Sequence, residues 1–145
     1  MQITEHFSYE EMAHSTWAEK HRVKNDIPSR LMPNMEALCR EVLEPLRSAW
    51  DAPLRVTSGY RNAVVNRSVG GVMNSQHLTG EAADITTGSP TRNRYLLELI
   101  RHLAASGDLE FDQCIAEHTD DWGAPLWIHI SHRASGHNRK QMLEL

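Results

Sequence analysis

The sequence contains little cysteine and few aromatic residues, with two Cys, four Trp, three Tyr and two Phe among 145 residues. Cys39 and Cys114 lie far apart, without the close spacing of a thiolate metal site or a redox pair. We therefore expect two buried free thiols that pack as small apolar groups. This excludes a thiolate metal site and a redox function that depend on paired cysteines.

The sequence also has no excess of positive charge. Its 15 basic residues stand against 19 acidic residues, which gives a formal net charge of -4. A protein that follows nucleic-acid phosphates or an anionic membrane needs a cationic surface. We therefore expect neither nucleic acid nor membrane as a partner, and a metal-dependent nuclease is disfavoured.

A long apolar run is missing from the start of the sequence. The segment "MQITEHFSYEEMAH" contains glutamates and no apolar stretch, so it predicts neither a secretory signal nor a membrane span. We expect synthesis in the cytoplasm. Access to an extracellular target would then require another export route, release by lysis or transport in a virion.

The length of the chain and its 40% hydrophobic content predict one domain over residues 1–145. Ser8 and Glu11 form a capping-box pattern, so a short helix is expected from Tyr9 to before the charged run at 20–24. Apolar residues at helical spacing predict a long helix over 29–50, bent by Pro45.

The second half of the sequence predicts mostly strands. β-rich patterns occur at 54–57, 111–118 and 125–132, the stretch 74–87 turns from loop into strand, and residues 140–145 fit an edge strand. A helix is expected from the serine cap and proline at 89–90 to Gly107. This order favours an α+β fold with a mostly antiparallel sheet covered by helices on one side. We expect a monomer.

Three residues fit the ligand set of a catalytic zinc site. Such sites use three protein ligands drawn from His, Asp and Glu and leave a fourth position open. In "NSQHLTGEAADITT", Gly80 lets the chain fold back so that His77 and Asp84 can converge. His129 in "WIHIS" lies on the strand face opposite to that of the isoleucines. Taken singly, the strand histidine could merely be hydrogen-bonded, and Asp84 could pair with an arginine.

Three segments together resemble the zinc D-alanyl-D-alanine carboxypeptidase family, which shares its fold with the Hedgehog signalling domain. They are "TSGYRN" at 57–62, "SQHLTGEAADI" at 75–85 and "WIHISH" at 127–132. The segments "EHFSYEEM", "LEPLR" and "HNRKQML" further resemble the compact phage and prophage branch of this family. The resemblance implies one Zn²⁺ per chain, held by His77, Asp84 and His129.

The resemblance also implies roles for residues beside the metal. Arg61 would bind a carboxylate or carbonyl of the peptide, and Ser75 and Trp127 are further substrate-binding candidates, although Ser75 can equally shape its loop. Many family members carry a catalytic glutamate three residues before the last histidine, where this chain has Leu126. In the compact branch that the chain resembles, a glutamate often ends the preceding strand instead, as Glu117 does in "DQCIAEH", so the resemblance implies Glu117 as the general base. The reserve candidates Asp120 and Asp121 fit a solvated turn better.

Two functions remain open on these grounds. The first is a zinc-dependent peptidase that hydrolyses bonds of D-amino acids in peptidoglycan stem peptides, as a DD-carboxypeptidase or an endopeptidase. The second is a non-catalytic, zinc-stabilised module that binds cell wall or belongs to a phage structure. The missing glutamate at position 126 keeps the second function open.

Overall fold

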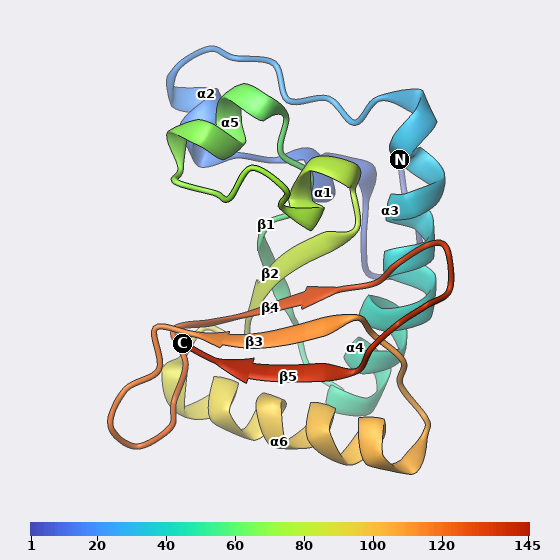
Figure 1. Ribbon diagram of the computed structural model, residues 1–145, viewed down its shortest axis with the longest axis vertical. Coiled ribbons are helices and arrows are strands. Elements are labelled where there is room, and N and C mark those ends of the chain that lie inside the picture. Colours follow the sequence, from blue (N-terminus) through green and yellow to red (C-terminus); the bar gives the residue numbers. More distant parts are fainter.

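The computed structural model describes residues 1–145 and contains one five-stranded sheet. The strands are β1 (Arg55–Ser58), β2 (Ala82–Thr86), β3 (Gln113–Glu117), β4 (Trp127–Ser131) and β5 (Gln141–Glu144). They lie in the order β1-β2-β4-β3-β5 (Figure 1). Only the β3–β5 pair is parallel. The predicted α+β fold with a mostly antiparallel sheet is confirmed, including the edge strand at the end of the chain.

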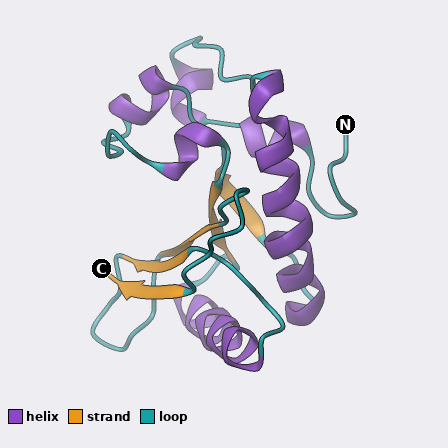
Figure 2. Cartoon of the chain, turned by 45° about the vertical axis from the view of Figure 1, so that its right-hand side comes forward, coloured by secondary structure: helices purple, strands orange, loops and turns teal.

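Helices occupy the first part of the chain and the connection between β2 and β3. They are α1 (Tyr9–Ala13), α2 (Thr16–Lys20), α3 (Met32–Leu38), α4 (Glu44–Trp50), α5 (Ala63–Ser68) and α6 (Pro90–Ser106). Short turns of other helix types are η1 (Ser29–Leu31), η2 (Cys39–Leu43) and η3 (Gln76–Thr79). Figure 2 shows α6 and the long α3–α4 column beside the sheet, with the shorter helices grouped beyond one end of it.

The predicted helix over 29–50 is present, but its type changes before Pro45. The turn η2 is a π-helix, in which the Glu44 N–H donates to the Cys39 carbonyl five residues back. Proline has no N–H, and its ring clashes with the carbonyl four residues before it, here that of Glu41. A π turn relieves such a conflict while the helix continues. A wider turn thus precedes Pro45, and the bend expected at this residue stays a prediction.

The predicted first helix is wrong in one respect, because it is divided in two. Ser8 caps α1 as expected, with its hydroxyl accepting from the Glu11 N–H. His14 is then extended, and Ser15 caps α2 by accepting from the Ala18 N–H at 3.1 Å. A second serine at the right spacing restarts the helix in a new direction.

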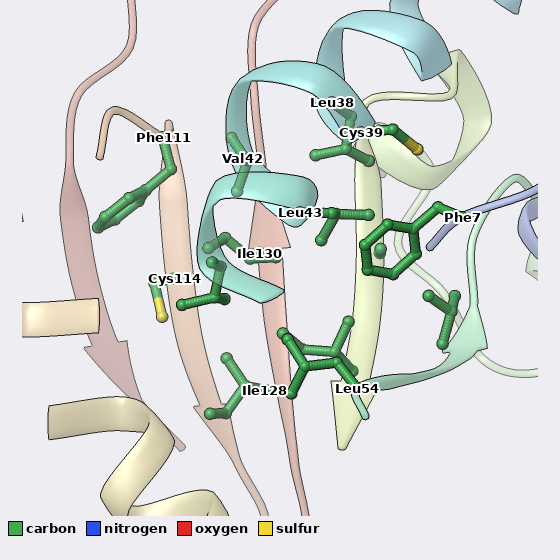
Figure 3. Close-up of a cluster of buried hydrophobic side chains, with 14 of the residues drawn as sticks. Phe7, Leu38, Cys39, Val42, Leu43, Leu54, Phe111, Cys114, Ile128 and Ile130 are labelled. Carbon is green, nitrogen blue, oxygen red and sulfur yellow. The ribbon is translucent and has the colours of Figure 1, made fainter. Parts of the chain in front are cut away.

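One face of the sheet carries the core. Ala83, Ile85, Cys114, Ala116, Ile128 and Ile130 are buried there, in one cluster with residues of α3, η2, α4 and α6. Figure 3 shows Leu38, Val42 and Leu43 of the helix column on the side of the sheet where Ile128 and Ile130 of β4 point. Each fully buried Leu or Ile contributes about 1.5–3 kcal/mol relative to an exposed one.

Because side chains alternate along a strand, the residues between these core positions point to the other face of the sheet. That face carries Asp84, Ile115, Glu117, Trp127 and His129, all of which line one cavity. The two long helices therefore cover only the core face, as expected. None of the helices has the length and apolar character that crossing a membrane requires.

Candidate metal centre

His77, Asp84 and His129 come together from three elements. His77 lies on η3, Asp84 is the middle residue of β2, and His129 is its direct partner on β4. Asp84 Oδ1 lies 3.3 Å from His77 Nε2 and 3.0 Å from His129 Nδ1. One potential ligand atom from each residue lies within 4.8 Å of the others. The predicted ligand set is therefore assembled in space.

Gly80 allows this convergence. It ends η3 in the left-handed conformation, with φ of 73°, and its N–H returns to the carbonyls of Gln76 and His77. A residue with a Cβ is strained at this φ. The reversal places the start of β2 beside η3, so that a seven-residue separation in sequence becomes a contact between His77 and Asp84, as expected from the sequence.

The ring of His77 is fixed by a hydrogen bond behind it. Its Nδ1 lies 2.6 Å from the carbonyl oxygen of Gly59. A carbonyl only accepts, so Nδ1 carries a proton and donates it to Gly59, and Nε2, which lies toward Asp84, is the nitrogen left for a metal ion. Metal-binding histidines use such a partner to set the tautomer and ring orientation. The side chain of His77 is buried, so this arrangement is shielded from water.

Gly59 cannot be replaced without moving the chain. A Cβ at this position would lie 2.3 Å from the Met12 carbonyl oxygen, which accepts the Tyr60 N–H at 2.8 Å. We expect Gly59→Ala to lower the free energy of unfolding by about 3 kcal/mol, because the opposing atom belongs to the backbone. Urea unfolding measures this loss, and zinc titration should show weaker binding, since the partner of His77 shifts.

Gly123→Ala provides the comparison for that prediction. Gly123 has φ of 78° and no atom within 4 Å of a new Cβ, so its replacement costs only the left-handed conformation, about 1–2 kcal/mol. Zinc affinity should then be unchanged. Equal stability and equal zinc affinity of Gly59→Ala and the wild type would show that the close approach to Met12 is unimportant.

Asp84 carries a negative charge in a buried position. Its exposed fraction is 6%. Desolvation alone raises the pKa of this carboxyl group, but the charge of His77 and the hydrogen bonds from His129 and His77 outweigh it, so the pKa lies below its ordinary value. The group is therefore held as a carboxylate, the form that binds a metal ion.

Arg61 lies against the other oxygen of Asp84. Its Nη2 donates to Asp84 Oδ2 at 3.1 Å, its Nε donates to Ser58 Oγ at 2.9 Å, and its backbone N–H donates to the His77 carbonyl. Burial lowers the pKa of Arg61, partly offset by the charge of Asp84. The guanidinium thus holds Asp84 in place, and Arg61 also lines the cavity.

The cavity over the site has a volume of about 1000 Å³. It is bordered by the predicted ligands, by Arg61 and Glu117, and by Ser75 and Trp127. Glu117 pairs with Trp127 across the β3–β4 ladder, and its carbonyl accepts the Leu126 N–H at 2.9 Å. The two alternative positions for the family's glutamate, 117 and 126, are therefore neighbours across this hairpin.

The substrate-binding candidates have structural contacts as well. Ser75 caps η3 and accepts the His77 N–H at 3.1 Å, so it also shapes the turn that carries the ligand. Trp127 lies with its ring centroid 4.7 Å from that of His118. Both residues line the cavity, but the structure leaves their roles toward a substrate as predictions.

The reserve candidates Asp120 and Asp121 lie outside the cavity lining. Asp120 accepts the N–H groups of Trp122 and Ala124 at 2.9 Å, which is the role of a turn residue. Asp121 and Trp122 are exposed. His132 follows β4 with a buried Nδ1 that has no partner, and burial lowers its pKa.

The donor set fits zinc. Bonds of about 2.1 Å at tetrahedral angles separate two ligand atoms by about 3.4 Å, close to the 3.0 and 3.3 Å found around Asp84. Two imidazoles and one carboxylate leave a fourth position toward the cavity. When bound, the ion would polarise a substrate carbonyl and acidify a water molecule.

Sequence reasoning missed one part of the cavity wall. Asp112, Arg133 and Arg139 form a charged cluster, and both arginines line the cavity. The only sequence signal is the segment "HNRKQML", which carries part of the family resemblance. Asp112 lies just before β3 and both arginines lie after β4, so no local pattern brings them together.

Two comparisons with known proteins agree with this geometry. Residues 5–109 match the model of a family described as Peptidase M15. A segment of 48 residues is 44% identical to the "Zinc D-Ala-D-Ala carboxypeptidase" of Streptomyces albus G. That segment is 32% of this chain and only 19% of the relative. The family match includes His77 and Asp84. It ends before Glu117 and His129, so it does not test the roles predicted for these two residues.

Proposed function

Since this chain belongs to the Peptidase M15 family, we propose that it is a zinc peptidase that hydrolyses bonds of D-amino acids in the stem peptides of bacterial peptidoglycan. The observation that carries the proposal is a single cavity that contains three zinc ligands, a carboxylate and a guanidinium. The name of the Streptomyces relative supports a peptide substrate that ends in D-alanine. The phage and prophage branch stays a prediction.

Glu117 is the proposed general base and acid. Hydrolysis of a peptide bond requires a group that takes a proton from the attacking water and returns it to the leaving amine. Glu117 lies on the cavity face of β3, and the neighbouring residue of that face, Ile115, pairs directly with His129. Its carboxylate is therefore on the same wall as the metal ligands.

Arg61 and its partners orient the site and the substrate. Arg61 donates hydrogen bonds to Ser58 and Asp84, and the bond to Asp84 keeps that carboxylate turned toward the histidines. Each terminal guanidinium nitrogen has two N–H bonds, so hydrogens remain for a substrate carbonyl or carboxylate. We propose that Ser75 and Trp127, which both line the cavity, contact the peptide.

The second candidate function is binding without hydrolysis. Leu126 occupies the position at which many family members carry the glutamate, and it is 53% exposed. If Glu117 did not act on the substrate, the same cavity would hold a peptide without cleaving it.

Metal removal tests the proposal. The zinc-loaded protein should release D-alanine, or a shorter peptide, from a synthetic stem pentapeptide ending in D-Ala-D-Ala. A chelator should abolish this release and added zinc should restore it, because the ion supplies several kcal/mol of stabilisation to the transition state. Chromatography of the products measures the reaction. Turnover that is unaffected by the chelator would contradict a zinc peptidase, and binding without turnover would favour the second candidate.

A further inference from the structure

A second charged cluster lies in the wall of the same cavity and has no part in the function proposed so far. Its centre is Asp112, whose side chain is fully buried. Asp112 follows Phe111 at the start of β3, and its carboxylate accepts from Gln76, Arg133 and Arg139. Gln76 directly precedes the ligand His77, so the cluster is tied to the turn that carries the metal site.

The arginines are held in defined positions. Arg139 is bidentate, with Nε 2.8 Å from Oδ1 and Nη2 2.9 Å from Oδ2 of Asp112. Arg133 Nε lies 3.1 Å from Oδ2. The hydrogen bond from Arg139 is the largest cause that lowers the pKa of Asp112 to about 2, against an opposing effect of desolvation. Two guanidinium groups thus share one carboxylate.

This sharing leaves positive charge and free donors on the cavity wall. The side chains of Arg133 and Arg139 are 39% and 45% exposed, and both line the cavity. Neither Arg133 Nη2 nor Arg139 Nη1 donates a hydrogen bond in the structure. Arg61 differs, because all three of its guanidinium nitrogens donate to protein groups.

We infer that Arg133 and Arg139 form a carboxylate-binding subsite for the peptide, separate from Arg61. The inference rests on the proposed function, since it assigns a part of the same cavity. Planar guanidinium groups with free N–H edges match the geometry of a carboxylate. A buried Asp112 that orients both groups reduces the side-chain entropy that binding would otherwise cost.

A stem peptide offers two sources of this carboxylate. One is its C-terminal group, and the other is the free carboxylate of its internal D-glutamate. Three forms of one synthetic pentapeptide separate them: all carboxylates free, the C-terminus amidated, and the D-glutamate carboxylate amidated. Calorimetric titration of each into the zinc-loaded Glu117→Gln protein measures binding without cleavage.

We expect one of the two amidated peptides to bind about 10-fold more weakly than the free form, because amidation removes a charge-assisted hydrogen-bonded pair with the arginines. Arg133→Gln should weaken binding of the free peptide by a similar factor and leave that of the same amidated peptide unchanged. Arg94→Gln, an exposed charge loss on α6 away from the cavity, is the control and should change neither. The identity of the sensitive peptide assigns the source.

Arg133 has one contact to Asp112 while Arg139 has a bidentate one, so Arg133 is the variant less prone to unfold. The three-peptide comparison identifies the carboxylate that is bound, and the Arg133→Gln variant assigns its binding to this cluster rather than to Arg61. Equal affinity for all three peptides, no binding of any of them, or an equal loss for all in Arg133→Gln would overturn the subsite. Discrimination between the peptides that Arg133→Gln removes, in a protein whose wild type cleaves none of them, would keep the subsite and reject the proposed peptidase.

Discussion

Replacing His129 by alanine is expected to abolish zinc binding and to lower hydrolysis by about 10³-fold or more. His129 supplies one of three ligands, and the transition-state stabilisation from the ion amounts to several kcal/mol, with about 1.4 kcal/mol for each factor of ten. The fold should remain, because Asp84 keeps its contacts with His77 and Arg61. Zinc titration, turnover of the stem pentapeptide and circular dichroism measure these three effects.

His102→Ala is the control for this prediction. His102 is an exposed histidine on α6, so its loss removes an imidazole without affecting the site. That variant should bind one zinc ion per chain and retain full turnover. Zinc binding and full activity in His129→Ala would contradict the assigned ligand set. If His129→Ala did not fold, His129→Gln, which keeps a polar side chain at this less buried position, would take its place in the test.

Replacing Glu117 by glutamine is expected to lower kcat by about 10²–10⁴-fold while zinc affinity and KM change little. The amide keeps the size of the side chain but cannot accept a proton, which is the contribution assigned to Glu117. Because Glu117 is not among the three clustered ligands, the metal should still bind. Steady-state kinetics on the stem pentapeptide, together with zinc titration, separate the two properties.

Glu144→Gln makes the same change of charge on the neighbouring strand. Glu144 is exposed on β5, is paired with Ala116, and lies outside the cavity lining. Turnover by the Glu144→Gln variant should equal that of the wild type. Unchanged kcat in Glu117→Gln would contradict the role of base and would move the function toward binding without hydrolysis.

Much of the metal site could be predicted because its determinants are local. The motif around Gly80 specifies a reversal, and a reversal needs only a residue that tolerates positive φ at the right place. Strand alternation by itself predicts that His129 points to the face opposite to Ile128 and Ile130, whichever strand pairs with it. The register that sets His129 opposite Asp84 then followed from burying the isoleucines on the core face.

The parts that could not be predicted depend on contacts between distant segments. Asp112 reaches Arg133 and Arg139 only because β5 runs parallel to β3 and returns residues 133–139 to its start. The close approach of Gly59 to Met12 also joins segments 47 positions apart. Capping patterns also do not predict the extended residue His14 between the two serine caps, because each serine by itself predicts the start of a helix and not the end of the one before it.

The central claim is that this cavity cleaves peptidoglycan peptides with zinc. The most direct test is mass spectrometry of purified peptidoglycan incubated with the zinc-loaded protein, beside a chelated sample. We expect fragments with the masses of peptides cut at a bond of a D-amino acid, released only when zinc is present. Intact peptidoglycan from several wall types, with one zinc ion bound per chain, would contradict the central claim.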